Sequence, residues 1–314
     1  MSTLLTLIVL LVGGGLVGAH LWTRRLAATA ERAIPQKGLL RAVPGGRLHY
    51  VDLGPRDARP VVLIHGLSGQ MQHWDYGVAE ALSDTFRVIA LDRPGCGWSD
   101  RDGEDQAPPA EQGRMIQALL DDLGVEEPVL VGHSLGGAVA LAMALDQPEA
   151  AGALALLCPL THGVEASIPV FKPLEVRNAA IRRLIGATLA APLAKRNGAE
   201  ALTAVFGPEP WPQDFPVKGG GVLGLRPKAY VVASEDLVAA QTAIAAQAAR
   251  YGDLKVPGGV LYGGVDEILD PAAQGEAMRA HGLAYEALAG RGHMIPVTDP
   301  QACVDFIRRM AALA

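Results

Sequence analysis

Charged side chains are scarce in this chain of 314 residues: Asp, Glu, Lys and Arg make up 19%, below the roughly 25% of an average soluble domain. Intrinsic disorder is nevertheless excluded, because hydrophobic residues make up 50% of the chain and disordered chains have too few of them to collapse. The net charge of −6 argues against a nucleic-acid-binding protein, whose binding surface is basic. The length indicates one large domain, or one domain with an accessory piece.

Cysteine is also rare. The three cysteines, Cys96, Cys158 and Cys303, are too few and too scattered for a disulfide framework or a zinc cluster. We expect neither a metal site nor a cofactor.

No charged residue occurs before Arg24, and residues 4–22 form an uninterrupted stretch of 19 residues without Asp, Glu, Lys or Arg. As an α-helix this stretch is about 28 Å long, close to the roughly 30 Å thickness of the bilayer hydrocarbon. Trp22 lies where an interfacial aromatic residue is expected, and two arginines follow it. We therefore predict a transmembrane anchor over residues 1–23 that contacts the bilayer through residues 4–22.

Two other interpretations of this stretch are open. A signal peptide would be cleaved near Ala28-Thr29-Ala30, but the stretch has no basic residue before it and two arginines lie between it and that site. A buried core helix would usually be amphipathic or shorter. Because the basic residues follow the stretch, the positive-inside rule favours a single-pass protein with a cytoplasmic catalytic domain. We expect residues 24–40 to form a short tether, polar at its start and broken by Pro35.

After the tether, short β-branched runs alternate with helical stretches, which is typical of an α/β fold with a mostly parallel, doubly wound sheet. The predicted strands are Leu48–Leu53, Val61–His65, Arg87–Asp92, Val129–Gly132, Ala153–Leu157, Gly259–Tyr262 and Ala284–Leu288. The predicted helices are Trp74–Leu82, Gln112–Leu123, Gly137–Asp146, Glu235–Arg250, Pro271–His281 and Gln301–Leu313.

Residues 161–226 interrupt this alternation, because no strand is apparent in them. Their helical pieces are Leu174–Ile185, Thr188–Lys195 and Glu200–Val205. The segment is apolar, so we expect a helical lid inserted after a strand and not a disordered linker. It holds eight Lys or Arg residues against five acids. This excess of positive charge is consistent with a lid that faces an anionic membrane, and equally with an ordinary solvated surface.

The segment Gly132-His133-Ser134-Leu135-Gly136 matches the G-x-S-x-G pattern. The match is weak by itself, but a buried-strand run precedes it and a helical run follows it, as the pattern requires. Glycines flank the serine because the tight turn leaves no room for Cβ atoms. We predict that Ser134 is a nucleophile; the alternative role is a helix N-cap.

A serine nucleophile needs a base and an orienting acid. His293 is the candidate base, because it lies in a glycine-rich loop between the last strand and the last helix. Asp266 is the candidate acid, since it follows a strand and two glycines and precedes the histidine in the chain. Glu267 and Asp270 are close enough in sequence to be rivals.

Two backbone N–H groups are candidates for the oxyanion hole. Leu67 follows the His65-Gly66 pair at the end of a strand, and Leu135 follows the nucleophile. Such donors are each worth about 3 kcal/mol of barrier. We expect His65 itself to shape the loop by bonding to backbone.

Four motifs occur in the order typical of α/β-hydrolase-fold serine hydrolases of the esterase and lipase type: His65-Gly66 with Trp74, the loop Asp92–Asp100, the Gly132–Gly136 turn, and the pair Asp266 and His293. The chain resembles this family from about residue 45 onward. The resemblance implies a hydrolase domain over residues 41–314 with a lid at about 161–226. It also implies a triad of Ser134, Asp266 and His293. Relatives that cleave epoxides or carbon–halogen bonds have aspartate at the position of Ser134, so the resemblance favours acyl chemistry.

The predicted function is a membrane-anchored serine hydrolase that cleaves small-molecule carboxylic esters, lipid-like ones with apolar acyl chains, through an acyl-enzyme on Ser134. An acyltransferase, or a cofactor-free haloperoxidase or perhydrolase, would use the same triad. A membrane-tethered binding protein that keeps the fold without catalysis is the alternative from a different class.

Overall fold

The computed structural model describes residues 2–164 and 168–314. A nine-stranded sheet forms its centre, with strand order β1-β2-β4-β3-β6-β7-β8-β9 and the short β5 paired with β2. The strands are β1 (Leu39–Val43), β2 (Gly46–Leu53), β3 (Pro60–Ile64), β4 (Arg87–Leu91), β5 (Asp100–Arg101), β6 (Val129–His133), β7 (Ala153–Leu157), β8 (Gly258–Gly263) and β9 (Ala284–Leu288).

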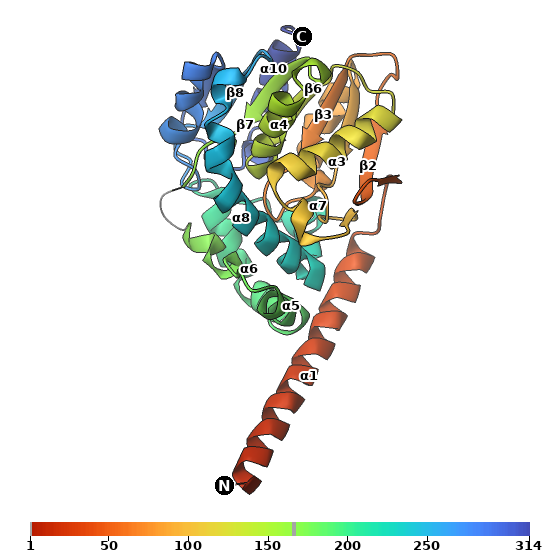
Figure 1. Cartoon of the computed structure of the whole chain (residues 1–314), viewed down its shortest axis with the longest axis vertical. Coiled ribbons are helices and arrows are strands. Elements are labelled where there is room, and N and C mark those ends of the chain that lie inside the picture. The colour runs from red at the N-terminus through yellow and green to blue at the C-terminus, as the bar shows by residue number, and fades with distance from the viewer. Residues whose placement is uncertain (1, 165–167) are drawn as a thin grey trace.

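The sheet is parallel from β4 to β9, whereas β1, β2 and β5 are antiparallel additions at one side. Helices α3 (Pro109–Asp122) and α4 (Leu135–Asp146) pack together on one face, and α2 (Val78–Ser83) and α10 (Pro300–Ala311) pack together on the other. Figure 1 shows these layers. Every residue of β4, β6 and β7 is buried, as expected for strands covered on both faces.

All seven predicted strands are present, with ends that differ by at most two residues. Strands β1 and β5 were not predicted. Strand β1 lies at the edge of the sheet and is partly exposed along its length, so it lacks the apolar run that marks a buried strand. Strand β5 has only two residues, which is too short for any periodicity.

The N-terminal helix α1 is longer than the predicted anchor and runs from Ser2 to Ala33. It is the one helix in the described part of the chain that is long and apolar enough to cross a membrane. The expected tether over residues 24–40 is therefore wrong in its extent: only residues 34–38 link α1 to β1. The helix continues past the arginines because Leu26 and Ala30 are buried against the rest of the molecule. The helix ends at Ala33 because the next residue, Ile34, precedes Pro35, and a residue before proline disfavours the helical conformation.

The described residues of 161–226, called the cap segment below, contain helices and no strand, as predicted. They comprise η4 (Pro169–Leu174), α5 (Ala179–Thr188), α6 (Ala190–Phe206), α7 (Phe215–Lys218) and η5 (Gly221–Leu225). Helix α6 is continuous where two pieces were predicted. The next helix, α8 (Pro227–Ala248), begins eight residues before the predicted Glu235.

The predicted helix Pro271–His281 is not α-helical. A π-helical turn, η7 (Pro271–Gly275), is followed by a 3₁₀ helix, η8 (Glu276–His281). Gly275 lies so close to the sheet that a Cβ atom there would be 2.5 Å from the Tyr262 ring and 2.7 Å from the Tyr285 ring. The backbone is thus held against two aromatic rings, a contact that sequence periodicity does not predict.

The turn between β6 and α4 packs directly against β3. A Cβ atom on Gly136 would lie 2.3 Å from the carbonyl oxygen of Ile64 and 2.5 Å from that of His65. Both obstacles are backbone atoms, so no side-chain rotation relieves the clash. Position 136 therefore requires glycine, because the backbone of residues 64 and 65 comes too close for a Cβ atom.

We therefore expect Gly136→Ala to lower the free energy of unfolding by about 3 kcal/mol or more, because the interior must shift to admit one methyl group. The control is Gly198→Ala in α6, where no atom lies within 4 Å of the added Cβ and the better helix former should raise stability by about 0.5–1 kcal/mol. Urea unfolding in detergent, followed by circular dichroism, measures both. Equal stability of the two variants would contradict the packing argument.

Candidate active site

Ser134 lies at a strained turn between β6 and α4. Its backbone has φ +55° and ψ −123°, a conformation that non-glycine residues adopt only where the surroundings impose it. The carbonyl of Ser134 accepts hydrogen bonds from the N–H groups of Gly137 (2.8 Å) and Leu160 (2.9 Å), and its own N–H donates to Leu157 O (3.1 Å). The turn presents the side chain at the carboxyl end of the parallel strands, where open α/β sheets bind ligands.

Asp266 and His293 form a hydrogen-bonded pair. Nδ1 of His293 lies 2.7 Å from Oδ2 of Asp266, and both side chains are buried. The other carboxylate oxygen accepts the N–H groups of Ile268 (2.8 Å) and Leu269 (3.0 Å). A carboxylate only accepts hydrogen bonds, so Nδ1 carries the proton and Nε2 is left as the basic nitrogen.

The rival acids lie apart from this pair. Glu267 and Asp270 are both exposed. The Asp270 carboxylate accepts the N–H of Ala273 (2.8 Å) and so begins η7. The geometry therefore favours Asp266 as the residue that orients His293.

The nucleophile candidate and the histidine are brought to the same region through His133. Its ring lies 5.0 Å from that of His293, and its Nε2–H donates to the His293 carbonyl (3.0 Å). Burial, with a contribution from His293, lowers the pKa of His133 well below its usual value, so it stays neutral. Within the described residues no hydrogen bond joins Ser134 Oγ to His293; such contacts are often long without substrate.

His65 is buried and bonds to backbone through both ring nitrogens. Nδ1 donates to Gly66 O (2.8 Å), and Nε2 accepts the N–H of Arg93 (2.9 Å). Burial, reinforced by the Arg93 charge, lowers the pKa of His65 well below its usual value. The expectation that His65 shapes its loop agrees with this arrangement.

The Arg93 guanidinium holds the same loop from the other side. Its Nε donates to His65 O (2.9 Å), and one Nη donates to Gly66 O (3.0 Å). The peptide unit is planar and trans, so its C=O and N–H groups point in opposite directions. Fixing the Gly66 carbonyl therefore fixes the direction of the Leu67 N–H. Sequence reasoning did not identify this role of Arg93.

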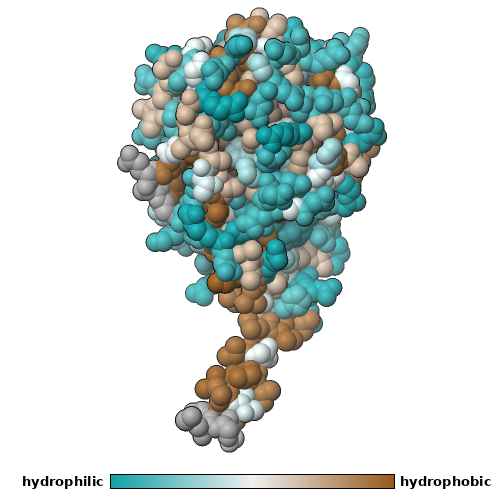
Figure 2. All heavy atoms as spheres, viewed as in Figure 1, coloured by the Kyte–Doolittle hydropathy of each residue, from teal (hydrophilic) through white to brown (hydrophobic). Residues whose placement is uncertain are grey.

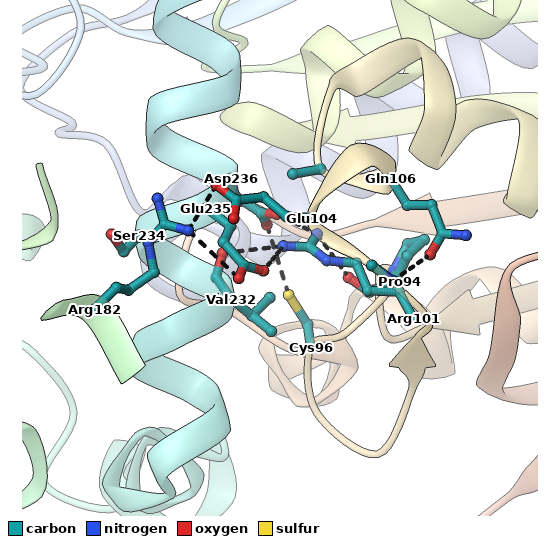
Figure 3. A network of polar contacts seen from close by, with 12 residues as sticks. Pro94, Cys96, Arg101, Glu104, Gln106, Arg182, Val232, Ser234, Glu235 and Asp236 are labelled. Atoms are coloured by element: carbon teal, nitrogen blue, oxygen red, sulfur yellow. Dashed lines mark hydrogen bonds and ion pairs between the residues drawn. The ribbon is translucent and has the colours of Figure 1, made fainter. Parts of the chain in front are cut away.

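Arg93 also belongs to a buried ion-pair network, most of which Figure 3 shows. Its other Nη lies 2.8 Å from Asp236 on α8, and Asp236 also accepts Arg101 (2.5 Å). Arg101 pairs with Glu235 (2.8 Å), which in turn lies 3.5 Å from Arg182 on α5. The network thus connects the loop after β3 with α8 and the cap segment.

A cavity of about 400 Å³ lies beside Ser134, within the size range of small-molecule sites. Ser134, Leu67 and Leu135 line it together, so the structure brings the predicted nucleophile and both predicted oxyanion donors to one surface. Leu135 is also the first residue of α4, where N–H groups lack intrahelical partners.

The rest of the cavity wall is mainly apolar. The cap segment and α8 both contribute to it, so the predicted lid residues form only part of the cover. The apolar residues from these two elements and from the loop after β8 are Val164, Ile168, Phe171, Leu237, Ala240, Ile244, Ile268 and Leu269. Such a lining suits an apolar ligand.

Cys158, Asp266 and His293 have potential ligand atoms within 4.8 Å of one another. They do not suit a metal ion. Both Asp266 oxygens are occupied by hydrogen bonds, and the Cys158 sulfur accepts the Gly263 N–H (3.3 Å). Burial raises the pKa of the Cys158 thiol well above its usual value, whereas a metal ligand must be the thiolate.

Part of the chain is similar in sequence to known proteins. It is 38% identical over 132 residues to the dihydrolipoyllysine-residue acetyltransferase component of the acetoin cleaving system of Pseudomonas putida, a match that covers 42% of this chain and 34% of that protein. It is 35% identical over 127 residues to a 2-hydroxy-6-oxononadienedioate/2-hydroxy-6-oxononatrienedioate hydrolase of Paraburkholderia phymatum, covering 40% of this chain and 44% of that protein. These matches span less than half of each relative.

Comparison with solved structures gives the same architecture. The enol-lactonase of Burkholderia xenovorans superposes with a TM-score of 0.70 at 22% identity, covering 87% of this chain and 100% of the other. A sequence profile of the alpha/beta hydrolase fold matches residues 59–300, which is most of the chain. The chain belongs to the α/β-hydrolase-fold family.

Proposed function

We propose that this protein is a membrane-anchored serine hydrolase that cleaves carboxylic esters with apolar acyl chains. The observation that carries the proposal is Ser134 on a strained turn beside an apolar cavity, while the ring of its neighbour His133 contacts His293 of the hydrogen-bonded Asp266–His293 pair. The names of related proteins, a hydrolase and an enol-lactonase, support hydrolytic chemistry.

The proposed reaction proceeds through an acyl-enzyme. Ser134 Oγ attacks the ester carbonyl carbon while Nε2 of His293 takes the hydroxyl proton. The N–H groups of Leu67 and Leu135 donate to the oxyanion that forms, and Asp266 stabilises the imidazolium. The C–O bond then breaks and His293 returns the proton to the departing alcohol. Water, activated by the same histidine, releases the carboxylic acid and restores Ser134.

The proposed anchor is retained in the mature protein. Thr23 and Leu26 of α1 are buried in the molecule, and Thr23 Oγ1 donates to Thr188 O (2.7 Å). Cleavage at Ala28-Thr29-Ala30 would remove these contacts and expose the apolar surface of the cap segment. We therefore favour an anchor over a signal peptide.

We expect Ser134→Ala to lower kcat/KM for a p-nitrophenyl ester by about 10⁴-fold or more, because the nucleophile is lost. Asp266→Asn should lower it by about 10⁴-fold by holding the wrong tautomer of His293. Glu267→Gln is the matched control, and as an exposed substitution it should leave the rate within about threefold. Steady-state kinetics measure all three. A Glu267→Gln loss as large as that of Asp266→Asn would contradict the assigned acid.

From the apolar lining of the cavity we also predict a preference for long acyl chains over short ones. Each buried methylene contributes about 0.8 kcal/mol, so we expect kcat/KM for octanoate to exceed that for acetate by about tenfold or more. Leu237→Trp should fill part of the cavity and reduce the octanoate rate more than the acetate rate. Equal losses for both esters, or a preference of the unaltered protein for acetate, would count against an apolar acyl substrate.

A further inference from the structure

Helix α1 has two halves with different surroundings. The side chains before Thr23 are largely exposed, including Leu10 (69%) and Trp22 (51%). From Thr23 onward one side of the helix is buried, through Thr23, Leu26 and Ala30. Figure 1 shows the first half extending away from the molecule while the second half runs beside α5.

Two hydrogen bonds fix the level at which α1 leaves the molecule. His20 Nδ1 donates to Ala187 O (3.0 Å), and Thr23 Oγ1 donates to Thr188 O (2.7 Å). The junction between α5 and α6 is therefore level with residues 20–23. The charge-free stretch ends at this same level, at Trp22. If the stretch spans a bilayer, the junction lies at the membrane surface.

The junction is flanked by exposed apolar side chains. Ile181 and Leu184 on α5 are each 52% exposed, and Leu189 and Leu193 at the start of α6 are 46% and 50% exposed. Scattered exposed leucines are ordinary, but a group of them beside an apolar helix is typical of a membrane contact. Figure 2 shows hydrophobic surface where the projecting helix meets the rest of the molecule.

Exposed basic side chains occur on the same three helices, α1, α5 and α6. Arg24 and Arg25 follow the apolar stretch on α1, and Arg183, Lys195 and Arg196 are exposed on α5 and α6. Within the described residues none of these five forms an ion pair, and the only acid on α5 or α6 is Glu200. Unpaired cations next to apolar side chains suit anionic lipid headgroups.

We propose that the α5–α6 junction, residues 181–193, lies in the headgroup region of an anionic phospholipid bilayer and inserts its apolar side chains into the acyl boundary. This proposal rests on the proposed anchor. The cap segment then faces the membrane, and Arg177, which lines the cavity, precedes α5 by two residues.

The test uses the full chain reconstituted in vesicles of phosphatidylcholine and phosphatidylglycerol, with one fluorophore at a time. Three variants, Leu184→Cys, Leu10→Cys and Leu313→Cys, are labelled with an environment-sensitive dye; the native cysteines are buried. Leu313 is the matched control, because it is as exposed as Leu184 (52% each) and lies near the C-terminus, far from α1 in Figure 1. Spin-labelled lipids, labelled either near the headgroup or deep in the acyl chain, quench the dye according to its depth.

We expect the Leu184 dye to be quenched by the shallow label, the Leu10 dye by the deep label, and the Leu313 dye by neither. A Leu189→Cys variant repeats the measurement if the first label disturbs α5. Deep quenching at Leu10 with none at Leu184 or Leu189 would overturn the membrane contact while leaving the anchor intact. Absence of quenching at Leu10 would overturn the anchor, and the contact with it, without bearing on catalysis by Ser134.

Discussion

The buried pair of Arg93 and Asp236 is the interaction on which the candidate site most depends. Arg93 holds the carbonyls of His65 and Gly66, while Asp236 fixes Arg93 to α8. Removing one partner of such a pair leaves a buried charge and costs about 3–5 kcal/mol, whereas an apolar replacement of both is often neutral. The pair therefore matters for geometry more than for stability. It makes the direction of the Leu67 N–H depend on the position of the helices that cover the cavity.

A series of contacts between helices also connects the proposed membrane anchor with the cavity beside Ser134. Helix α1 is fixed to the α5–α6 junction by Thr23, α5 is joined to Glu235 on α8 through Arg182, and α8 lines the cavity beside Ser134. Each step is a contact between elements far apart in sequence. The proposed anchor and the proposed catalytic site are thus parts of one packed structure.

The sequence was most informative where structure depends on neighbouring residues in the chain. Apolar runs such as Val61–Ile64 predicted the buried strands, and glycines around Ser134, Asp266 and His293 marked the loops at the carboxyl end of the sheet. A strand at the sheet edge such as β1 carries no comparable pattern. The pairing of Arg93 with Asp236 spans 143 residues, and the burial of Thr23 depends on a partner 165 residues away, so neither could be inferred from spacing.

The proposed reaction depends on acylation of Ser134. Its most direct test is reaction of the full-length protein with a fluorophosphonate, followed by digestion and mass spectrometry of the modified peptide. We expect one adduct, on Ser134, that is absent from Ser134→Ala protein folded as well as the parent. An unmodified Ser134, or an adduct that persists in the Ser134→Ala variant, would show that Ser134 is not the nucleophile.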